Sequence, residues 1–325
     1  MDKINWGIIG CGDVAELKSG PAFQKVNNSN LVAVMRRNAE KSKDFAERHQ
    51  VEFWYNSVDD LLANTKINAV YIATPPSTHL EIIKKCLDAK MLVYLEKPIT
   101  INYNEALILN KILNPNDKVV VAHYRRELPN FKKVKELIDT NSIGKILFAD
   151  IQILQSKSNK VINTSSDWRL KPEISGGGYF YDIAPHQLDL MYHYFGDVKN
   201  AKGFATSSEK NGVNEIVNGI IEFKNGIHFR GIWNFNASEK NTKDECKIYG
   251  EKGVITFSFY GENVYLKTDD SESEFNFSNP VNIQEPMIHK TVNHFLGEGE
   301  NPCTVKEATK VIEIMDVFTG KIQAK

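Results

Sequence analysis

A glycine-rich turn directly after the first apolar run is the feature that most constrains the fold. The run Ile4–Ile9 is short and apolar, and the sequence GCGDVA follows it at once at residues 10–15. In a G-x-G-x-x-G/A pattern the first glycine permits a tight turn, the second lets the backbone approach a pyrophosphate, and the third small residue allows close helix packing. The motif therefore predicts a dinucleotide site after the first strand of a parallel sheet, with an ordinary tight turn as the alternative. The predicted cofactor contacts are Gly10, Cys11, Gly12, Asp13 and Val14.

The chain as far as residue 122 alternates short apolar runs with longer amphipathic stretches, which is typical of βαβ units. Further strands are predicted at Leu31–Met35, Ala69–Ala73, Leu92–Leu95 and Val119–Ala122. Helices are predicted at Ala39–His49, Ser77–Asp88 and Asn102–Leu113. A parallel sheet covered by helices on its faces is the expected result.

Composition excludes several classes of protein. The 325 residues predict about two domains, and 42% hydrophobic with 25% charged residues is ordinary for a soluble globular protein. A net charge of −1 gives no basic excess for binding nucleic acid. The N-terminus lacks a signal-peptide pattern and no apolar run approaches about 18 residues, so we expect a cytoplasmic protein without a membrane segment. The four cysteines have no paired spacing, which argues against disulfides and structural zinc. Cys11 lies in a glycine-rich turn that requires a small residue, so a reactive thiol is not expected there.

The end of the second predicted strand discriminates between the two nicotinamide dinucleotides. An acidic residue there would bind the ribose 2′-hydroxyl of NAD, whereas this chain has Arg36-Arg37-Asn38. Guanidinium groups bind a 2′-phosphate bidentately or stack on adenine, so Arg36 and Arg37 predict a preference for NADP over NAD. The alternative is charge on a solvent-exposed loop.

Two loops follow later strands at the carboxyl edge of the sheet, where open α/β folds bind ligands. The first is TPPSTH at residues 74–79, in which Thr74 and Pro75 are predicted to line the cofactor site and His79 is a further candidate. Ser77 or Thr78 also suits a helix cap without any ligand. The second loop is Glu96-Lys97-Pro98, where a half-buried lysine can donate a hydrogen bond to a substrate oxygen or move its proton. A solvated turn is the alternative.

A helix with a polar stripe is predicted after the triple glycine at residues 176–178. Pro185 is tolerated only in a first turn, which predicts a helix start near Ile183 with Asp182 as its N-cap. Asp182, His186, Asp189 and His193 then share one face of an otherwise apolar helix, which indicates that this face contacts something other than packed core. A histidine with a nearby carboxylate suits general acid/base chemistry, and a helix cap with a core histidine is the alternative. The stripe spans about three turns, too long to hold one metal ion.

Six segments in this order resemble the glucose–fructose oxidoreductase/inositol dehydrogenase/rhizopine catabolism (Gfo/Idh/MocA) family of NAD(P)-dependent oxidoreductases. They are GIIGCG at residues 7–12, ATP at 73–75, EKP at 96–98, HYRR at 123–126, DWR at 167–169 and residues 176–186. The resemblance implies an α/β fold with a Rossmann domain at residues 1–122 and a second domain at 123–325 on a large, mostly antiparallel open sheet. It also implies homodimers or homotetramers formed through the open face of that sheet.

The second half of the sequence agrees with this architecture. Strands are predicted at Ile146–Leu154, Val198–Ala205, Val213–Phe223, Ile227–Phe235, Asp244–Tyr249, Val254–Phe259 and Val264–Lys267. Helices are predicted at Glu285–Leu296 and Val305–Phe318.

By the same resemblance, Lys97 is the catalytic lysine, Asp182 the substrate-binding aspartate and His186 the acid/base histidine. Glu96 and Lys97 also border the cofactor. The candidate substrate-wall residues, for each of which a purely structural role is an equal alternative, are Tyr124, Arg125, Trp168 and Arg169. Many family members have Asn where this chain has Pro76, so a cofactor hydrogen bond at that position is not expected.

The resemblance implies an oxidoreductase that transfers hydride between a nicotinamide and a secondary alcohol or ketone of a sugar, inositol or related polyol. Two alternatives exist within the family. One is a glycosidase that keeps NAD bound and oxidises its sugar transiently, and the other is a dinucleotide-binding regulator without catalysis. Retention of Lys97, Asp182 and His186 favours catalysis over the regulator.

Overall fold

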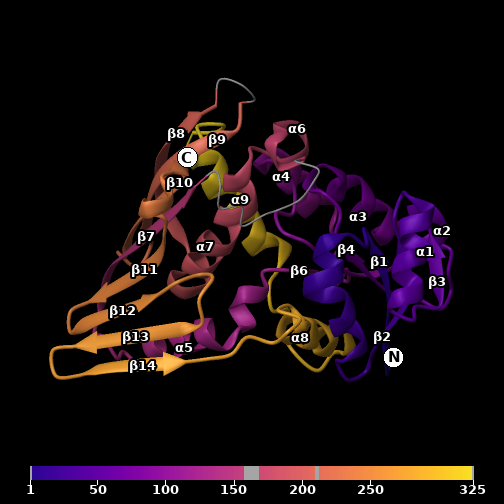
Figure 1. Ribbon diagram of the computed structural model, residues 1–325, viewed down its shortest axis with the longest axis horizontal. Coiled ribbons are helices and arrows are strands. Elements are labelled where there is room, and N and C mark those ends of the chain that lie inside the picture. The colour runs from indigo at the N-terminus through magenta and orange to yellow at the C-terminus, as the bar shows by residue number, and fades with distance from the viewer. Residues whose placement is uncertain (1, 157–167, 209–211, 324–325) are drawn as a thin grey trace. The chain divides into compact units, whose positions relative to one another are not determined.

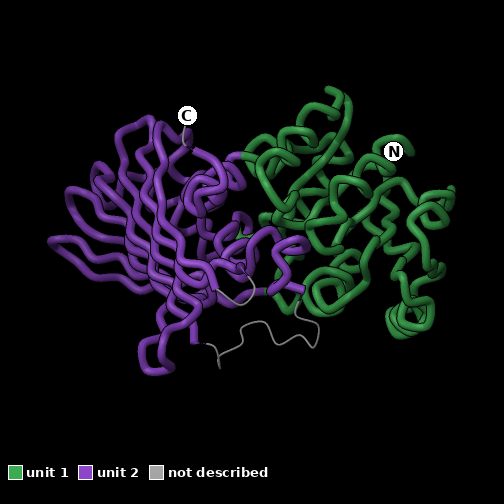
Figure 2. Tube along the Cα trace, turned by 90° about the horizontal axis from the view of Figure 1, so that it is seen from above, with its two compact units in different colours: residues 1–125, 280–309 green, residues 126–279, 310–325 purple. Residues whose placement is uncertain are grey.

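The computed structural model describes residues 2–156, 168–208 and 212–323. The chain divides into two compact units (Figure 2), of which unit 1 comprises residues 1–125 and 280–309 and unit 2 comprises residues 126–279 and 310–325. The first break lies close to the predicted join at residue 122. Residues 280–309, however, belong with the N-terminal residues, so the second half of the chain is not one continuous unit.

Unit 1 is built on a six-stranded parallel sheet whose strands lie in the order β3-β2-β1-β4-β5-β6 (Figure 1). The strands are β1 (Ile4–Ile9), β2 (Ser29–Met35), β3 (Phe53–Tyr55), β4 (Ala69–Ile72), β5 (Leu92–Leu95) and β6 (Val119–Val121). The strand order reverses between β1 and β4, and ligands of such sheets bind at this switch point, beyond the carboxyl ends of the strands. The predicted parallel sheet is confirmed.

Side-chain caps define where several helices of unit 1 begin. Asn38, Ser57 and Asn102 each accept a hydrogen bond from the amide three residues later, at 2.9, 3.1 and 2.9 Å. The helical segments of unit 1 are η1 (Ala15–Ser19), η2 (Gly20–Gln24), α1 (Ala39–Arg48), α2 (Val58–Leu62), η3 (Pro76–Thr78), α3 (His79–Asp88), α4 (Tyr103–Ile112) and α8 (Glu285–Leu296). The turn η4 (Tyr124–Glu127) crosses from unit 1 into unit 2. The segment η1 is a π-helical turn, and η2, η3 and η4 are 3-10 turns. Helix α3 packs on β4 and β5, while α8 packs on β1 and η2.

An aromatic cluster explains why residues 280–309 return to unit 1. The buried ring of Trp6 lies 4.7 Å from that of Phe23 and 5.7 Å from that of Phe295 on α8. Tyr71 and Tyr94, on adjacent strands, stack at 5.2 Å beside them. Burial of such rings is a large apolar contribution to stability, so α8 completes the core of unit 1.

Unit 2 is built on an eight-stranded sheet in the order β14-β13-β12-β11-β7-β10-β9-β8. Its strands are β7 (Ile146–Ser156), β8 (Val198–Ser207), β9 (Asn214–Phe223), β10 (His228–Ala237), β11 (Lys243–Gly250), β12 (Gly253–Phe257), β13 (Asn263–Thr268) and β14 (Glu272–Asn276). Only β7 and β10 pair in parallel, so the predicted mostly antiparallel sheet is confirmed for the described residues.

The two faces of this sheet differ because side chains alternate along each strand. One face packs on helices α5 (Pro129–Asp139), α7 (Tyr179–Phe195) and the end of α9 (Val305–Phe318) (Figure 1). The short segments η5 (Trp168–Leu170), α6 (Pro172–Ser175) and η6 (Glu239–Asn241) complete the unit. The other face is open and carries exposed side chains, among them Phe204 and Ile220.

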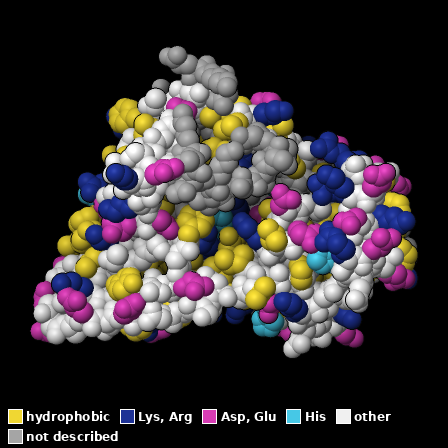
Figure 3. Space-filling model, viewed as in Figure 1, with side chains coloured by type: hydrophobic (Ala, Val, Ile, Leu, Met, Phe, Trp, Pro, Cys, Tyr) yellow, Lys and Arg dark blue, Asp and Glu magenta, His cyan; other side chains and the backbone are white. Residues whose placement is uncertain are grey.

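Charged side chains of both signs are interspersed over the visible surfaces (Figure 3). This agrees with the net charge of −1. Among the described residues, no helix is long and apolar enough to cross a membrane.

Two glycines in register, Gly203 and Gly219, let α9 approach the sheet closely. Gly203 on β8 pairs with Gly219 on β9, which pairs with Gly231 on β10. A Cβ added at Gly203 would lie 2.5 Å from the Cα of Phe318, and one at Gly219 would overlap the ring of Phe318. The ring therefore occupies the space that a side chain at residue 219 would need.

We expect Gly219→Ala to lower the free energy of unfolding by about 1–3 kcal/mol, as overpacking of a core does. Chemical denaturation would measure the loss. Phe318→Leu in the same chain should recover part of it by vacating the space, and Gly299→Ala is the control because a Cβ there would meet only Asn293, at 3.9 Å. Equal stability of the two alanine variants would show that the Phe318 contact does not limit residue 219.

Candidate functional site

The glycine turn of unit 1 has the geometry that its sequence predicts. Gly10 has a φ of +98°, and a Cβ there would lie 2.9 Å from the backbone of Ala73 and Thr74. The amides of Gly10 and Cys11 both donate to the carbonyl oxygen of Met35, at 2.9 and 3.2 Å. A Cβ added at Gly12 would meet nothing within 4 Å. Gly10 is thus fixed against β4 while Gly12 borders open space, an arrangement that fits the close approach of a pyrophosphate.

Cys11, inside the turn, is buried, and burial raises the pKa of its thiol to about 11. The thiol is therefore protonated at neutral pH and is a poor nucleophile. Asp13 is exposed and Val14 is half-buried at the start of the helical segment that follows.

Arg36 and Arg37 follow β2 and differ in their contacts. Arg36 is half-buried, and its guanidinium donates to the carbonyl oxygen of Cys11 at 3.4 Å. Arg37 is exposed, and Asn38 is occupied as the cap of α1. One guanidinium therefore lies against the glycine turn, with a second beside it in sequence.

His79 connects the two loops that follow β4 and β5. Its ring is fully buried, with Nε2 2.8 Å from the carbonyl oxygen of Thr74 and Nδ1 3.1 and 3.3 Å from those of Pro98 and Ile99. Burial lowers the pKa of His79, although these carbonyl contacts oppose the shift. The structure therefore gives His79 a role in tying the loops together, and its predicted contact with the cofactor has no further support.

The loop after β4 is also held from within. The Thr78 hydroxyl lies 2.8 Å from the Thr74 hydroxyl and 2.9 Å from the carbonyl oxygen of Pro75. Thr78 occupies the N-cap position of α3 but makes no side-chain cap hydrogen bond. Its hydroxyl thus supports the Thr74-Pro75 wall and not the helix.

A buried hydrogen-bond network lies behind Lys97. The Glu96 carboxylate accepts hydrogen bonds from the Tyr71 hydroxyl at 2.6 Å, the Gln284 side-chain amide at 2.7 Å and the Lys97 backbone amide at 3.1 Å. Tyr94 donates to the other end of the Gln284 side chain at 2.9 Å. The peptide bond between Lys97 and Pro98 is cis. The three hydrogen bonds direct the Glu96 carboxylate into the core, so its part is to hold the Lys97 backbone. The Lys97 side chain is half-buried.

The helix that carries Asp182 and His186 begins earlier than the sequence predicts. Helix α7 starts at Tyr179, so Asp182 is not the N-cap and Pro185 lies inside the helix. The cap position belongs to Gly178, whose φ of +88° a residue with a side chain rarely adopts. The glycines therefore allow the helix to begin six residues before the proline, which leaves the Tyr181 carbonyl without an amide from residue 185.

Arginines face the polar stripe of α7. The Arg169 side chain donates to the Asp182 carboxylate at 2.8 Å. Arg126 donates twice to Asp189, at 2.9 and 2.7 Å, and these two side chains are only 2% and 1% exposed. A buried carboxylate requires such compensation. The stripe thus contains two ion pairs. Neither pairing is apparent from the sequence, because each arginine lies in a separate segment that precedes α7 along the chain.

The remaining candidates fall within one unit or the other. His186 is buried, one helical turn after Asp182. The Arg169 guanidinium lies 4.4 Å from the Trp168 ring, so Trp168, Arg169 and Asp182 form one cluster in unit 2. Asp167 of the same motif lies outside the described residues. Lys97, Tyr124 and Arg125 belong to unit 1, where the Tyr124 ring and the Arg125 guanidinium, both buried, are 5.5 Å apart.

Comparison with known families covers most of the chain. Residues 4–124 match the oxidoreductase family with an NAD-binding Rossmann fold, and residues 131–256 match the GFO/IDH/MocA C-terminal domain. The chain belongs to the GFO/IDH/MocA family of oxidoreductases. The match to an NAD-binding Rossmann fold indicates a nicotinamide dinucleotide as cofactor. The geometry around Gly10 and Gly12 fits the pyrophosphate of such a molecule.

Individual relatives agree with this assignment. Oxidoreductase P35 of Formosa agariphila is 53% identical over 320 residues, covering 98% of this chain and 99% of that protein. Among solved structures, levoglucosan dehydrogenase in complex with NADH has a TM-score of 0.87 at 20% identity and covers 97% of this chain and 96% of that chain. A 3-ketoreductase from Actinomadura kijaniata in complex with NADP and TDP-benzene has a TM-score of 0.81 at 19% identity, with 97% of both chains covered. These two likenesses show the shared fold.

Proposed function

We propose that this oxidoreductase is a dehydrogenase or reductase that transfers hydride between a nicotinamide dinucleotide and a secondary alcohol or ketone of a sugar, inositol or related polyol. The observation that carries the proposal is the arrangement on α7, where buried His186 follows Asp182 by one turn and Arg169 holds the Asp182 carboxylate. An imidazole can exchange a proton with a hydroxyl near neutral pH, and an oriented carboxylate can bind a neighbouring hydroxyl.

The chemistry divides among the three residues. When bound, the nicotinamide accepts hydride from the carbinol carbon or returns it to the ketone. In the oxidative direction His186 takes the hydroxyl proton through a ring nitrogen. The Lys97 ammonium donates a hydrogen bond to the same oxygen and stabilises the negative charge that develops on it. Asp182 accepts a hydrogen bond from an adjacent hydroxyl, which favours a vicinal polyol over a simple alcohol.

The residues around Asp182 support this substrate class. The Arg169 guanidinium stacks beside Trp168 while it holds Asp182, so an apolar ring face and a charged pair lie next to each other. Sugars and inositols present the same combination of C–H faces and hydroxyl edges. We further propose Tyr124 and Arg125, in unit 1, as substrate contacts. Levoglucosan dehydrogenase, a structural neighbour, acts on a compound of this class.

An absorbance screen at the reduced-nicotinamide band, with both dinucleotides against sugars, inositols and their keto forms, tests the function. With the best substrate, His186→Ala and Lys97→Ala should each lower kcat at least about 100-fold, the lower range of acid/base contributions. The Kd for the dinucleotide should change little. His193→Ala, on the same helix but half-exposed, is the matched control. Turnover that survives both substitutions would refute the assigned roles, and a flat panel with tight cofactor binding would refute net oxidoreduction.

For the cofactor we propose a preference for NADP. Arg36 already lies against the glycine turn, and Arg37 is exposed beside it, so two guanidinium groups are available to a 2′-phosphate. Solved neighbours include complexes with NADH and with NADP, so the fold accommodates either.

Arg37→Asp should raise the Kd for NADP at least about tenfold, because it replaces attraction to the 2′-phosphate by repulsion. The Kd for NAD should change much less. Fluorescence titration of the reduced cofactors measures both values, and Lys43→Asp, an exposed charge reversal on α1, is the control. An equal loss for both dinucleotides would place the 2′-phosphate elsewhere.

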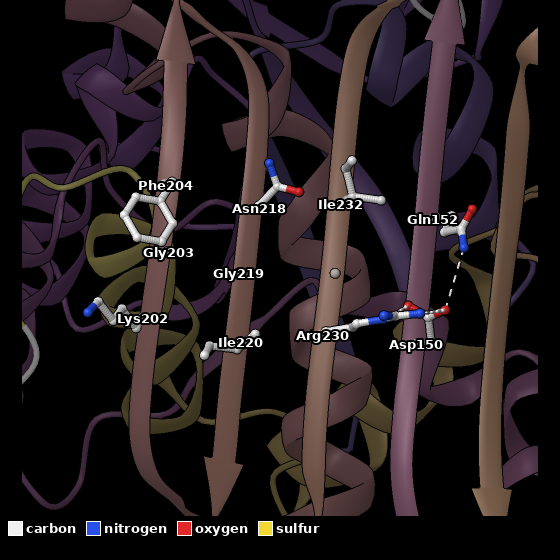
Figure 4. Close-up of a pocket in the computed structure, with 11 residues that line it drawn as sticks. Asp150, Gln152, Lys202, Gly203, Phe204, Asn218, Gly219, Ile220, Arg230 and Ile232 are labelled. Carbon is white, nitrogen blue, oxygen red and sulfur yellow. Dashed lines mark hydrogen bonds and ion pairs between the residues drawn. The ribbon is translucent and has the colours of Figure 1, made fainter.

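We also propose that the open face of the sheet in unit 2 binds a second copy of this chain. Phe204 and Ile220 on this face are 71% and 57% exposed, and an apolar patch of this kind marks an interaction surface. Figure 4 shows these two side chains on neighbouring strands, with Lys202 and the Arg230–Asp150 pair on the same sheet. All five residues line a hollow of about 330 Å³. Self-association through one two-fold patch would bury both apolar side chains.

Phe204→Glu combined with Ile220→Lys should shift the protein towards the monomer in sedimentation velocity at micromolar concentration. Ile108→Glu, at an exposed position on α4 of unit 1, should leave the mass unchanged. A wild-type monomer, or an oligomer that survives the double substitution, would contradict this assignment.

A further inference from the structure

The segment that follows α9 lies against the start of α7. The Lys321 ammonium donates to the carbonyl oxygen of Gly176, the first residue of the glycine loop before α7. The same ammonium lies 4.0 Å from the centroid of the Tyr181 ring, in the first turn of the helix. One side chain near the C-terminus therefore contacts the loop and the helix that it leads into.

Asp316 on α9 holds the same tyrosine from its other end. The Tyr181 hydroxyl donates to the Asp316 carboxylate at 2.6 Å and lies 2.9 Å from the Thr319 hydroxyl. The Lys321 backbone amide donates to the Asp316 carbonyl oxygen at 2.9 Å, and its ammonium is 3.9 Å from the Asp316 carboxylate. Tyr181 and Asp316 are both almost fully buried. The ring and the hydroxyl of Tyr181 are thus both fixed by residues of the C-terminal segment.

The ammonium sits in an environment that disfavours charge. Burial lowers the pKa of Lys321, and the nearby Asp316 carboxylate opposes that shift. Removing an ammonium from water is unfavourable unless it is well paired. Here the pairing consists of a carbonyl, an aromatic face and a carboxylate, and the first two belong to the segment that precedes Asp182.

Local interactions alone restrain the start of α7 weakly. Gly178 at the cap position has no side chain to bond the first amides, and Pro185 has no amide to donate to the Tyr181 carbonyl. Contacts from other segments have to supply the missing restraint. One such contact comes from Asn214, whose backbone and side-chain amides donate to the Gly177 carbonyl oxygen at 3.2 and 3.3 Å. Within the loop itself, the Ser175 hydroxyl accepts from the Gly178 amide at 3.0 Å.

We propose that Lys321 is a positioning residue for this site: by holding Gly176 and Tyr181 it sets the place of Asp182 and His186. The inference rests on the proposed function for its kinetic consequence, although its structural part stands without it. Lys321 acts through the glycine loop and the first helical turn and does not touch the reacting atoms. A misplacement of about 1 Å can reduce a rate about 100-fold, so a loosened start of α7 should lower kcat.

The central test substitutes Lys321→Met, which keeps the aliphatic stem and removes the charge. We expect kcat to fall at least about tenfold, with the Kd for the dinucleotide changed less than twofold, because the cofactor turn belongs to unit 1. Amide hydrogen exchange over residues 176–183 should accelerate at least about tenfold. Lys321→Arg should restore both quantities to within about threefold of the wild type. Lys224→Met is the matched control, since Lys224 pairs with Asp197 just beyond the other end of α7 and is exposed.

A second variant keeps the proposal testable if Lys321→Met folds poorly. Tyr181→Phe removes only the hydroxyl that bonds Asp316 and should change kcat and exchange in the same direction by a smaller factor. If no substrate in the panel turns over, the exchange measurement still decides the structural part: acceleration in Lys321→Met but not in Lys224→Met supports it. Unchanged exchange, or a normal kcat in Lys321→Met, overturns the positioning role.

Discussion

Both units depend on glycines whose neighbours lie closer than a side chain at that position would permit. In unit 1, Gly10 brings the first turn against the backbone that follows β4, and this contact joins two loops of the candidate cofactor site. In unit 2, Gly177 packs on the Tyr181 ring, while Gly219 accommodates Phe318 at the end of α9. Each approach needs a residue without a Cβ, because real Cβ atoms do not come within such distances of their neighbours. The glycines therefore fix both the cofactor turn and the start of α7.

The carboxylates on helix α7 of unit 2 also depend on contacts from other segments. Helix α7 is almost entirely buried, yet it carries two carboxylates, and each is compensated by an arginine from a segment that precedes the helix. The deeper pair, Arg126 with Asp189, is sealed from solvent and is suited to fixing the helix. The outer pair, Arg169 with Asp182, keeps some exposure, so the same kind of ion pair can orient the carboxylate that we propose as a substrate ligand.

Much of this organisation could be predicted from the sequence, because local patterns determine it. The apolar runs and the glycine motif predicted β1, β5 and the parallel sheet, and the periodicity of residues 285–296 predicted the bounds of α8. The patterns failed where local backbone conformation or a distant contact decides the outcome. Pro185 indicated a helix start near Ile183, but the positive φ of Gly178 moves that start to Tyr179. The short strands β3 and β14 lack a clear apolar alternation. Nothing in the sequence of α8 indicates that it packs on the core of unit 1.

The same distinction applies to the candidate site. Lys97, Asp182 and His186 stood out because they lie in recognisable local motifs, whereas Gln284 stands in no motif and is far in sequence from every residue that it serves. Its side chain bonds Glu96 and Tyr94, and its backbone amide bonds the Lys18 carbonyl oxygen in the helical segment after the glycine turn. The carboxylate that holds the Lys97 backbone is therefore fully supported only once residue 284 has folded back onto unit 1. Because unit 2 lies between these two stretches of sequence, the lysine loop cannot be completed by the first 125 residues alone. The order of the chain thus makes the site in unit 1 depend on residues that follow unit 2.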